Sequence, residues 1–346
     1  MVNKILFTDF KDYISLLFHN KISTDYVFYF LFTEDPRSSF FIRISSVLGL
    51  ISQNNIWVIS AYLSLFSFVS SWYLVKTLTR IYPSSTYSAA LSLLIWPSAV
   101  LWTAGIQKET VAVSCLFFLT TVLLSVFIEK KRITLVQLAL TILSSLVLWK
   151  VKYYYAGTFL VSACYFIFLQ KTSKLSLSIR LVLLVGSSVS LFYVLKMMHP
   201  VLSPTNFLTY LYQAYSENIS NSAVGNYVDY GLKENWLSFG KNAPYAFFNG
   251  LFRPFIWEAN SVFQYFAAIE NVVFYGIASS SLFYMIKQRT TLTHIVIACL
   301  FYVVILGVIL PLSTPNFGSL LRYKSSYFPF LLYLLCSLIE MNWRKK

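Results

Sequence analysis

A series of long apolar runs constrains this chain more than any other feature of its sequence. A helix needs about 20 mostly apolar residues to cross the hydrocarbon core of a bilayer. Stretches of that kind fall near residues 55–75, 86–105, 109–128, 133–149, 153–169, 178–196, 260–286, 292–312 and 325–342. The pattern predicts an all-α fold, a polytopic transmembrane helix bundle of about nine spans.

The composition supports a membrane environment and argues against a soluble domain. Of 346 residues, 57% are hydrophobic and 12% are charged, whereas about 25% are charged in an ordinary soluble domain. The formal net charge of +14 would suggest nucleic acid as a partner of a soluble protein. In a membrane protein the same charge is first explained by Lys and Arg on cytoplasmic loops, and we expect no nucleic-acid partner.

The basic residues predict the orientation of the bundle. Lys and Arg cluster after the first, third, fifth, seventh and ninth runs, so that every second connection is basic. The positive-inside rule then places the N-terminus outside and the C-terminus in the cytoplasm. An N-terminus on the outer face without a preceding span is unusual, so an additional helix upstream of this sequence remains an open interpretation.

The same pattern divides the chain into four parts. Residues 1–54 form an outer-face segment that contains an amphipathic interface helix near 40–52. Residues 55–196 hold the first six transmembrane helices, and residues 197–259 form a long outer loop. Residues 260–346 hold the last three transmembrane helices and a short cytoplasmic tail.

A second population of charges lies on the predicted outer face, where the positive-inside rule does not explain it. Because charges at membrane depth are costly, they are often functional. Four outer connections each supply at least one cation at one membrane level, which predicts a shared site for a phosphate or pyrophosphate group. Its binding residues would be Lys108, Lys150, Lys152, Arg253, Arg322 and Lys324, with Glu109, Trp257, Glu258 and Glu270 in supporting roles.

Plainer interpretations exist for these side chains. Long basic side chains at helix ends reach the interface at modest cost. Glu109 beside Lys108, and Glu258 near Arg253, fit simple ion pairs, and Glu270 within a span fits a structural pair with a cation. The cysteines lie in apolar runs and are interpreted as packing residues. No cofactor or metal-ligand motif is found, which leaves a divalent metal open, so the cofactor is unknown.

Three short motifs resemble polytopic proteins of bacterial polysaccharide assembly, a group that includes GT-C type glycosyltransferases and O-antigen polymerases. The motifs are Trp96-Pro97-Ser98 through Trp102 to Lys108-Glu109, Arg253-Pro254-Phe255 with Trp257-Glu258, and Arg322-Tyr323-Lys324. The resemblance implies an enzyme of the bacterial plasma (inner) membrane. Membrane lipids, a polyprenyl-linked sugar and other polysaccharide-assembly proteins would be its partners.

By the same resemblance, an acid of the first outer segment would activate the acceptor hydroxyl, and Asp9 or Asp12 is the candidate catalytic base. GT-C proteins have a span before that segment, and this sequence shows none. The resemblance and the outer cations together make an outer-face glycosyltransferase that uses a polyprenyl-phosphate-linked sugar the leading hypothesis. The alternatives are an O-antigen polymerase-type enzyme and, from another class, a transporter or flippase of lipid-linked or anionic substrates.

Overall fold

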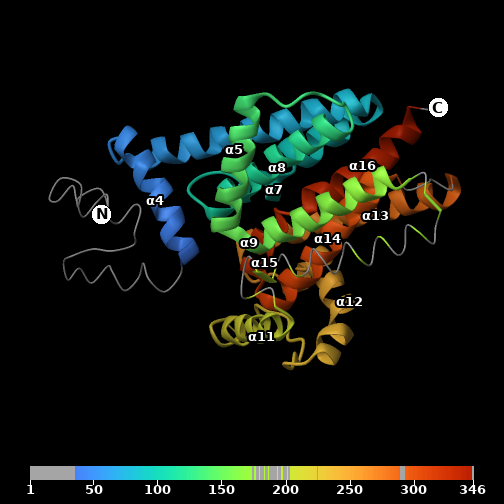
Figure 1. Ribbon diagram of the computed structural model, residues 1–346. Helices are drawn as coiled ribbons and strands as arrows, with labels where there is room; N and C mark the ends of the chain where they lie inside the picture. Colours follow the sequence, from blue (N-terminus) through green and yellow to red (C-terminus); the bar gives the residue numbers. More distant parts are fainter. Residues whose placement is uncertain are drawn as a thin grey trace.

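The fold is an elongated bundle of helices, seen in a computed structural model (Figure 1). The structure describes residues 36–173, 203–223, 225–288 and 293–344, together with isolated positions between 175 and 201. Within these ranges the regular elements are helices, and no strand is present. The predicted all-α fold is therefore confirmed for the described part of the chain.

Among the described residues, five helices are long and apolar enough to cross a membrane. They are α5 (Ile56–Ile81), α8 (Lys108–Phe127), α9 (Leu135–Lys171), α13 (Val262–Gln288) and α14 (His294–Ser313). The last helix, α16 (Phe328–Trp343), is apolar but shorter. These helices indicate a membrane protein, while the predicted number of nine spans is not confirmed.

One of the predicted spans is divided into several short helical segments. The run at 86–105 is divided into α6 (Thr86–Ala90), a π-helical segment (Leu91–Ile95) and α7 (Pro97–Trp102). The backbone leaves the helical region at Trp96, because the residue before a proline is disfavoured there. The predicted span at 178–196 falls mostly outside the described residues.

The runs at 133–149 and 153–169 form one helix, α9, with a break at Lys152. At this residue φ is −148° and ψ is 74°, outside helical values. A straight helix of 37 residues would be about 55 Å long, far more than a bilayer core. The break instead divides α9 into two arms that point in different directions (Figure 1), with Lys152 between them.

The segment predicted as a long outer loop is largely helical. It contains α11 (Pro204–Ser220) and α12 (Trp236–Phe252), which lie together beside the bundle (Figure 1). α12 packs closely on α14 at Gly250. A Cβ at this glycine would lie only 2.5 Å from Cγ of Pro311, so the position has no room for a side chain. The side-chain amide of Asn316, in the connection that follows α14, donates a hydrogen bond of 2.7 Å to Oγ of Ser222 and so joins this segment to the bundle.

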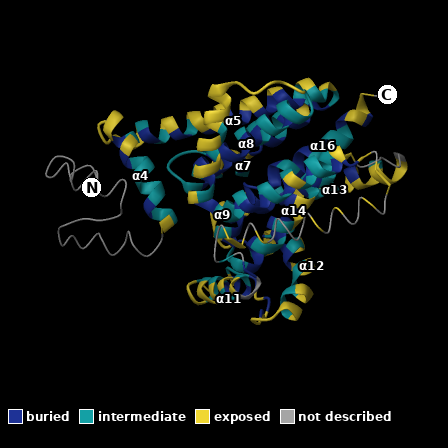
Figure 2. Cartoon of the chain, in the orientation of Figure 1, coloured by how far each residue is buried: buried dark blue, intermediate teal, exposed yellow. Residues whose placement is uncertain are grey.

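The predicted interface helix near 40–52 is also a helix, α4 (Pro36–Ile51). Its Phe40, Phe41, Ile44 and Leu48 pack against the main core. The bundle interior between α5, α8, α14 and α16 is buried, and exposed residues lie along the outer sides of α5 and of the first arm of α9 (Figure 2). α4 therefore covers one end of the bundle, next to the start of α8.

Candidate functional site

A tight turn before α8 places Glu109 inside the bundle. Gly105 has a φ of +77°, and a Cβ there would lie 3.2 Å from Oγ of Ser60. Its backbone N–H donates a hydrogen bond to Oγ of Ser64 on α5, at 2.9 Å. With the turn fixed against α5, α8 begins at Lys108, and Glu109 in its first turn is only 2% exposed.

The break in α9 supplies the first partner of this carboxylate. Lys152, at the break, is 4% exposed. Its Nζ lies 2.9 Å from Oε1 of Glu109. A buried charge is tolerated only when it is paired, so the Lys152–Glu109 ion pair joins α8 to the bend of α9.

A short helix before α16 supplies the second partner. α15 (Phe317–Lys324) begins after Asn316, whose side chain accepts hydrogen bonds from the backbone N–H groups of Gly318 and Ser319. Nε of Arg322 on this helix lies 3.3 Å from the same Oε1 of Glu109. Burial lowers the pKa of Arg322, but Glu109 and the nearby tyrosines together raise this pKa by more than burial lowers it, so the guanidinium stays charged.

Tyr323 completes the group. Nζ of Lys152 lies 4.2 Å from the centre of the Tyr323 ring, and Cζ of Arg322 lies 4.9 Å from it. Both cations are thus within the range of cation–π attraction. Nη2 of Arg322 also donates a hydrogen bond of 3.2 Å to the Tyr323 hydroxyl. We refer to Lys108, Glu109, Lys152, Arg322 and Tyr323 as the Glu109 cluster.

The Glu109 cluster lines a cavity of about 390 Å³. Phe41 of α4, Trp102, Ile106 and Gln107 complete its wall. Lys108 also donates a hydrogen bond to Oγ of Ser38 on α4, at 2.5 Å. Three cations and one carboxylate give the lining a formal charge of +2 (three minus one), and a cavity of that sign favours an anion.

Lys324 follows Arg322 by two residues but lies elsewhere. It is 5% exposed, and its Nζ donates hydrogen bonds to the Leu251 carbonyl at 2.6 Å and to Oδ1 of Asn271 at 2.9 Å. The same Nζ lies 4.4 Å from the centre of the Phe328 ring. These contacts join α12, α13 and α16, and Lys324 is not in the cavity lining. We refer to this lysine and its partners as the Lys324 anchor.

Arg253 is also separate from the Glu109 cluster. Its Nη2 lies 3.3 Å from Oε1 of Glu258, so the ion pair suggested by the sequence is present. The neighbouring Trp257 ring stacks on Phe255 with its centroid 4.9 Å away, and Trp257 is 81% exposed.

Two further predicted pairings differ from the structure. Glu109 pairs with Lys152 and Arg322 where the sequence suggested Lys108. Oε1 of Glu270 accepts a hydrogen bond of 2.7 Å from the backbone N–H of Ser98, which joins α13 to α7. Glu270 thus binds a peptide group directly, and its electrostatic interaction with Lys324 is a secondary contact.

The remaining predicted residues do not enter the cavity or cannot be placed. Lys150 is exposed on α9, and the candidate bases Asp9 and Asp12 lie outside the described residues. Within the described ranges, no group of three His, Cys, Asp or Glu side chains is placed to hold a metal ion. Tyr323 lines the cavity but was not among the residues predicted from the sequence. Asn316 is a typical helix N-cap, and this signal could have placed Tyr323 on one short helix with Arg322.

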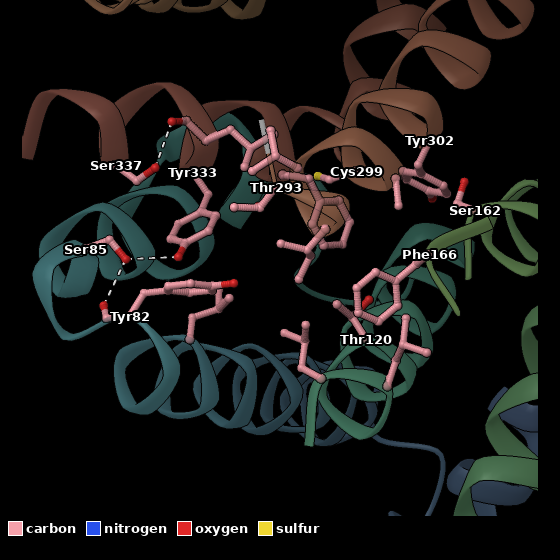
Figure 3. Close-up of a pocket in the computed structure, with 18 of the residues that line it drawn as sticks. Tyr82, Ser85, Thr120, Ser162, Phe166, Thr293, Cys299, Tyr302, Tyr333 and Ser337 are labelled. Carbon is pink, nitrogen blue, oxygen red and sulfur yellow. Dashed lines mark hydrogen bonds between the residues drawn. The ribbon is translucent and has the colours of Figure 1, made fainter. Parts of the chain in front are cut away.

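A second cavity, of about 300 Å³, lies between α5, α8, α9, α14 and α16. Figure 3 shows Tyr82, Cys299 and Phe166 around it, with the Ser85–Tyr333 hydrogen bond of 2.9 Å at one side. Its walls are almost entirely apolar, and no charged side chain lines it. Of these two cavities, only the first is lined by charged side chains.

Comparisons of the chain with known proteins give no functional assignment. No family model matches the sequence, and neither a characterised protein nor a solved structure matches it.

Proposed function

We propose that this protein is a membrane glycosyltransferase that takes a sugar from a polyprenyl-phosphate carrier at the outer face of the bacterial plasma membrane. The observation that carries the proposal is the positively charged cavity at the start of α8, lined by Lys108, Lys152 and Arg322 around one carboxylate. A lipid-linked phosphate brings its negative charge to one end of a membrane bundle and keeps its chain in the lipid. The position and sign of the cavity both suit such a ligand.

The cations have different tasks in this proposal. Arg322 is more than a third exposed at its side chain, so its guanidinium can exchange Glu109 for phosphate oxygens, which it binds in a two-pronged manner. Lys152 is almost fully buried and stays on Glu109. Glu109 therefore acts as a positioning residue: it holds Lys152 at one wall of the cavity, and it holds Arg322 there until the phosphate binds.

The reaction needs a base and a stabilised leaving group. An acceptor hydroxyl attacks the anomeric carbon, and its proton passes to a carboxylate. The bond between the anomeric carbon and the phosphate oxygen breaks, and the electron pair stays on the phosphate. The cations stabilise that growing charge. Glu109 is already engaged by two cations and is not the base in this proposal. The resemblance noted in the sequence makes Asp9 or Asp12 the candidate base.

The test uses a strain that lacks the gene, complemented with single variants. Arg322→Ala is expected to abolish the glycan product, with the variant protein still inserted in the membrane. Lys150→Ala removes an exposed cation two residues before the break in α9 and is the matched control, with normal product expected. Lipid-linked intermediates are measured by mass spectrometry.

The outcomes separate the proposal from the alternatives. An intermediate that lacks one sugar in the deletion strain supports transfer, whereas unpolymerised complete repeat units support the polymerase alternative. Accumulation of a fully assembled lipid-linked product on the cytoplasmic face supports a transporter. Normal glycan from the Arg322→Ala strain contradicts the proposed function.

A further inference from the structure

The position of Tyr323 suggests a role that goes beyond packing. It is the one aromatic hydroxyl among the residues that line the charged cavity. Its ring lies against Lys152 on α9, and its own helix places Arg322 beside it. Since Lys152 is itself paired with the buried Glu109, the ring lies against a cation that is held in place.

The hydrogen bond from Arg322 determines what the hydroxyl can do. Arg322 Nη2 is the donor, and the Tyr323 oxygen is the acceptor. A phenol oxygen that accepts a hydrogen bond keeps its own proton for another acceptor. Arginine has no acceptor atom, so the Tyr323 proton must be directed to a different group.

The cations also alter the acidity of this hydroxyl. Burial raises the pKa of Tyr323, but the positive charges of Lys152 and Arg322 lower it by more, so that the pKa falls below its ordinary value. A more acidic phenol is a stronger hydrogen-bond donor toward an anion.

We propose that the Tyr323 hydroxyl is a catalytic residue that donates a hydrogen bond to the phosphate of the bound donor substrate. This inference rests on the proposed function. The bond strengthens as negative charge grows on the leaving phosphate, and the proton stays on the phenol oxygen throughout. Tyr323 thus adds a neutral donor to the charged groups Lys108, Lys152 and Arg322, and its effect falls on the rate of transfer more than on binding.

The first experiment compares Tyr323→Phe with Tyr153→Phe. The phenylalanine at 323 keeps the ring that contacts Lys152 and loses only the hydroxyl. Transfer is expected to fall about 100-fold in kcat, the usual effect of removing one preorganised donor, with little change in KM. Tyr153 follows Lys152 directly but is not a lining residue, and its variant should transfer normally. Normal kcat in Tyr323→Phe overturns the inference, whether or not Arg322→Ala abolishes transfer.

The second experiment reads binding without activity. Tyr323 is replaced by 3-fluorotyrosine in the full chain, held in lipid nanodiscs, and its fluorine NMR signal is followed. Farnesyl phosphate and inorganic phosphate are the two probes. A shift with either supports contact with phosphate, and a shift with farnesyl phosphate alone assigns the site to a lipid headgroup. No shift with either probe overturns the inference. Loss of transfer in Tyr323→Phe without any such shift assigns the hydroxyl a structural role and also overturns it.

Discussion

Lys152 in the Glu109 cluster and Lys324 in the Lys324 anchor are both buried, yet they have opposite surroundings. Lys152 meets a carboxylate and lies at the wall of a polar cavity. Lys324 meets a backbone carbonyl, an amide oxygen and an aromatic ring, and it lies outside that wall. The partners of a buried lysine therefore distinguish an anion-binding site from a structural contact between helices.

The largest expected effect is that of Lys152→Met. The substitution leaves the Glu109 carboxylate buried with only the partly exposed Arg322 beside it. Breaking a buried ion pair by removing one partner costs about 3–5 kcal/mol, so we expect a large drop in the thermal unfolding midpoint of the purified protein. Tryptophan fluorescence of the protein in detergent is the measurement.

A second variant shows whether the loss comes from the charge. In Lys152→Met combined with Glu109→Gln the buried charge is gone, and most of the lost stability should return. Anion binding should remain weak, because Lys152 no longer contributes its charge to the cavity. A double variant as unstable as the single one would show that the shape of Lys152 at the break of α9 matters more than its charge.

Lys324→Met is expected to have the next largest effect, on stability alone. It leaves the Leu251 carbonyl and Asn271 Oδ1 without their lysine donor, and an unsatisfied buried acceptor costs about 1–3 kcal/mol. The unfolding midpoint should fall, while the remaining folded protein should bind farnesyl phosphate as the unchanged protein does. Weakened binding in the folded fraction would place Lys324 in the same functional unit as the Glu109 cluster.

The sequence predicted where helices lie along the chain better than it predicted the direction in which a charged side chain points. Apolar runs located α8 at 109–128, where the structure has Lys108–Phe127, since burial in lipid demands length and low polarity. Arg322 and Lys324 were predicted to share one site. They lie on α15, and helical residues two apart point about 200° away from each other. One side chain therefore reaches the cavity and the other reaches the core.

Long-range pairing explains the rest of what the sequence missed. The partner of Glu109 was expected at its neighbour Lys108, but Lys108 donates a hydrogen bond to Ser38 on α4. Lys152 reaches Glu109 because α9 breaks at this residue. Arg322 reaches Glu109 because α15 lies beside the start of α8. No local pattern in the sequence specifies that the break falls opposite the start of α8.

The smallest expected effect concerns an acid that, unlike Glu109, is exposed. Asp229, in the segment between α11 and α12, accepts hydrogen bonds from the Tyr215 hydroxyl at 2.5 Å and from the Gly231 N–H at 2.8 Å. Both bonds lower the pKa of Asp229, the Tyr215 bond most. Burial, aided by Asp229, raises the pKa of Tyr215 to about 12, so this phenol remains the donor near neutral pH.

Because the folded state lowers the pKa of Asp229, its stabilising contribution is full above the ordinary aspartate pKa of about 3.9. It is lost as the pH falls through the lower folded value. We expect the unfolding midpoint of the unchanged protein to fall more steeply between about pH 5 and pH 3 than that of Asp229→Asn. Glu217→Gln, an exposed acid on α11, is the control and should keep the original slope. Equal slopes for Asp229→Asn and the unchanged protein would show that the hydrogen bonds to this exposed carboxylate contribute nothing measurable, which would sharpen the contrast with the buried Glu109.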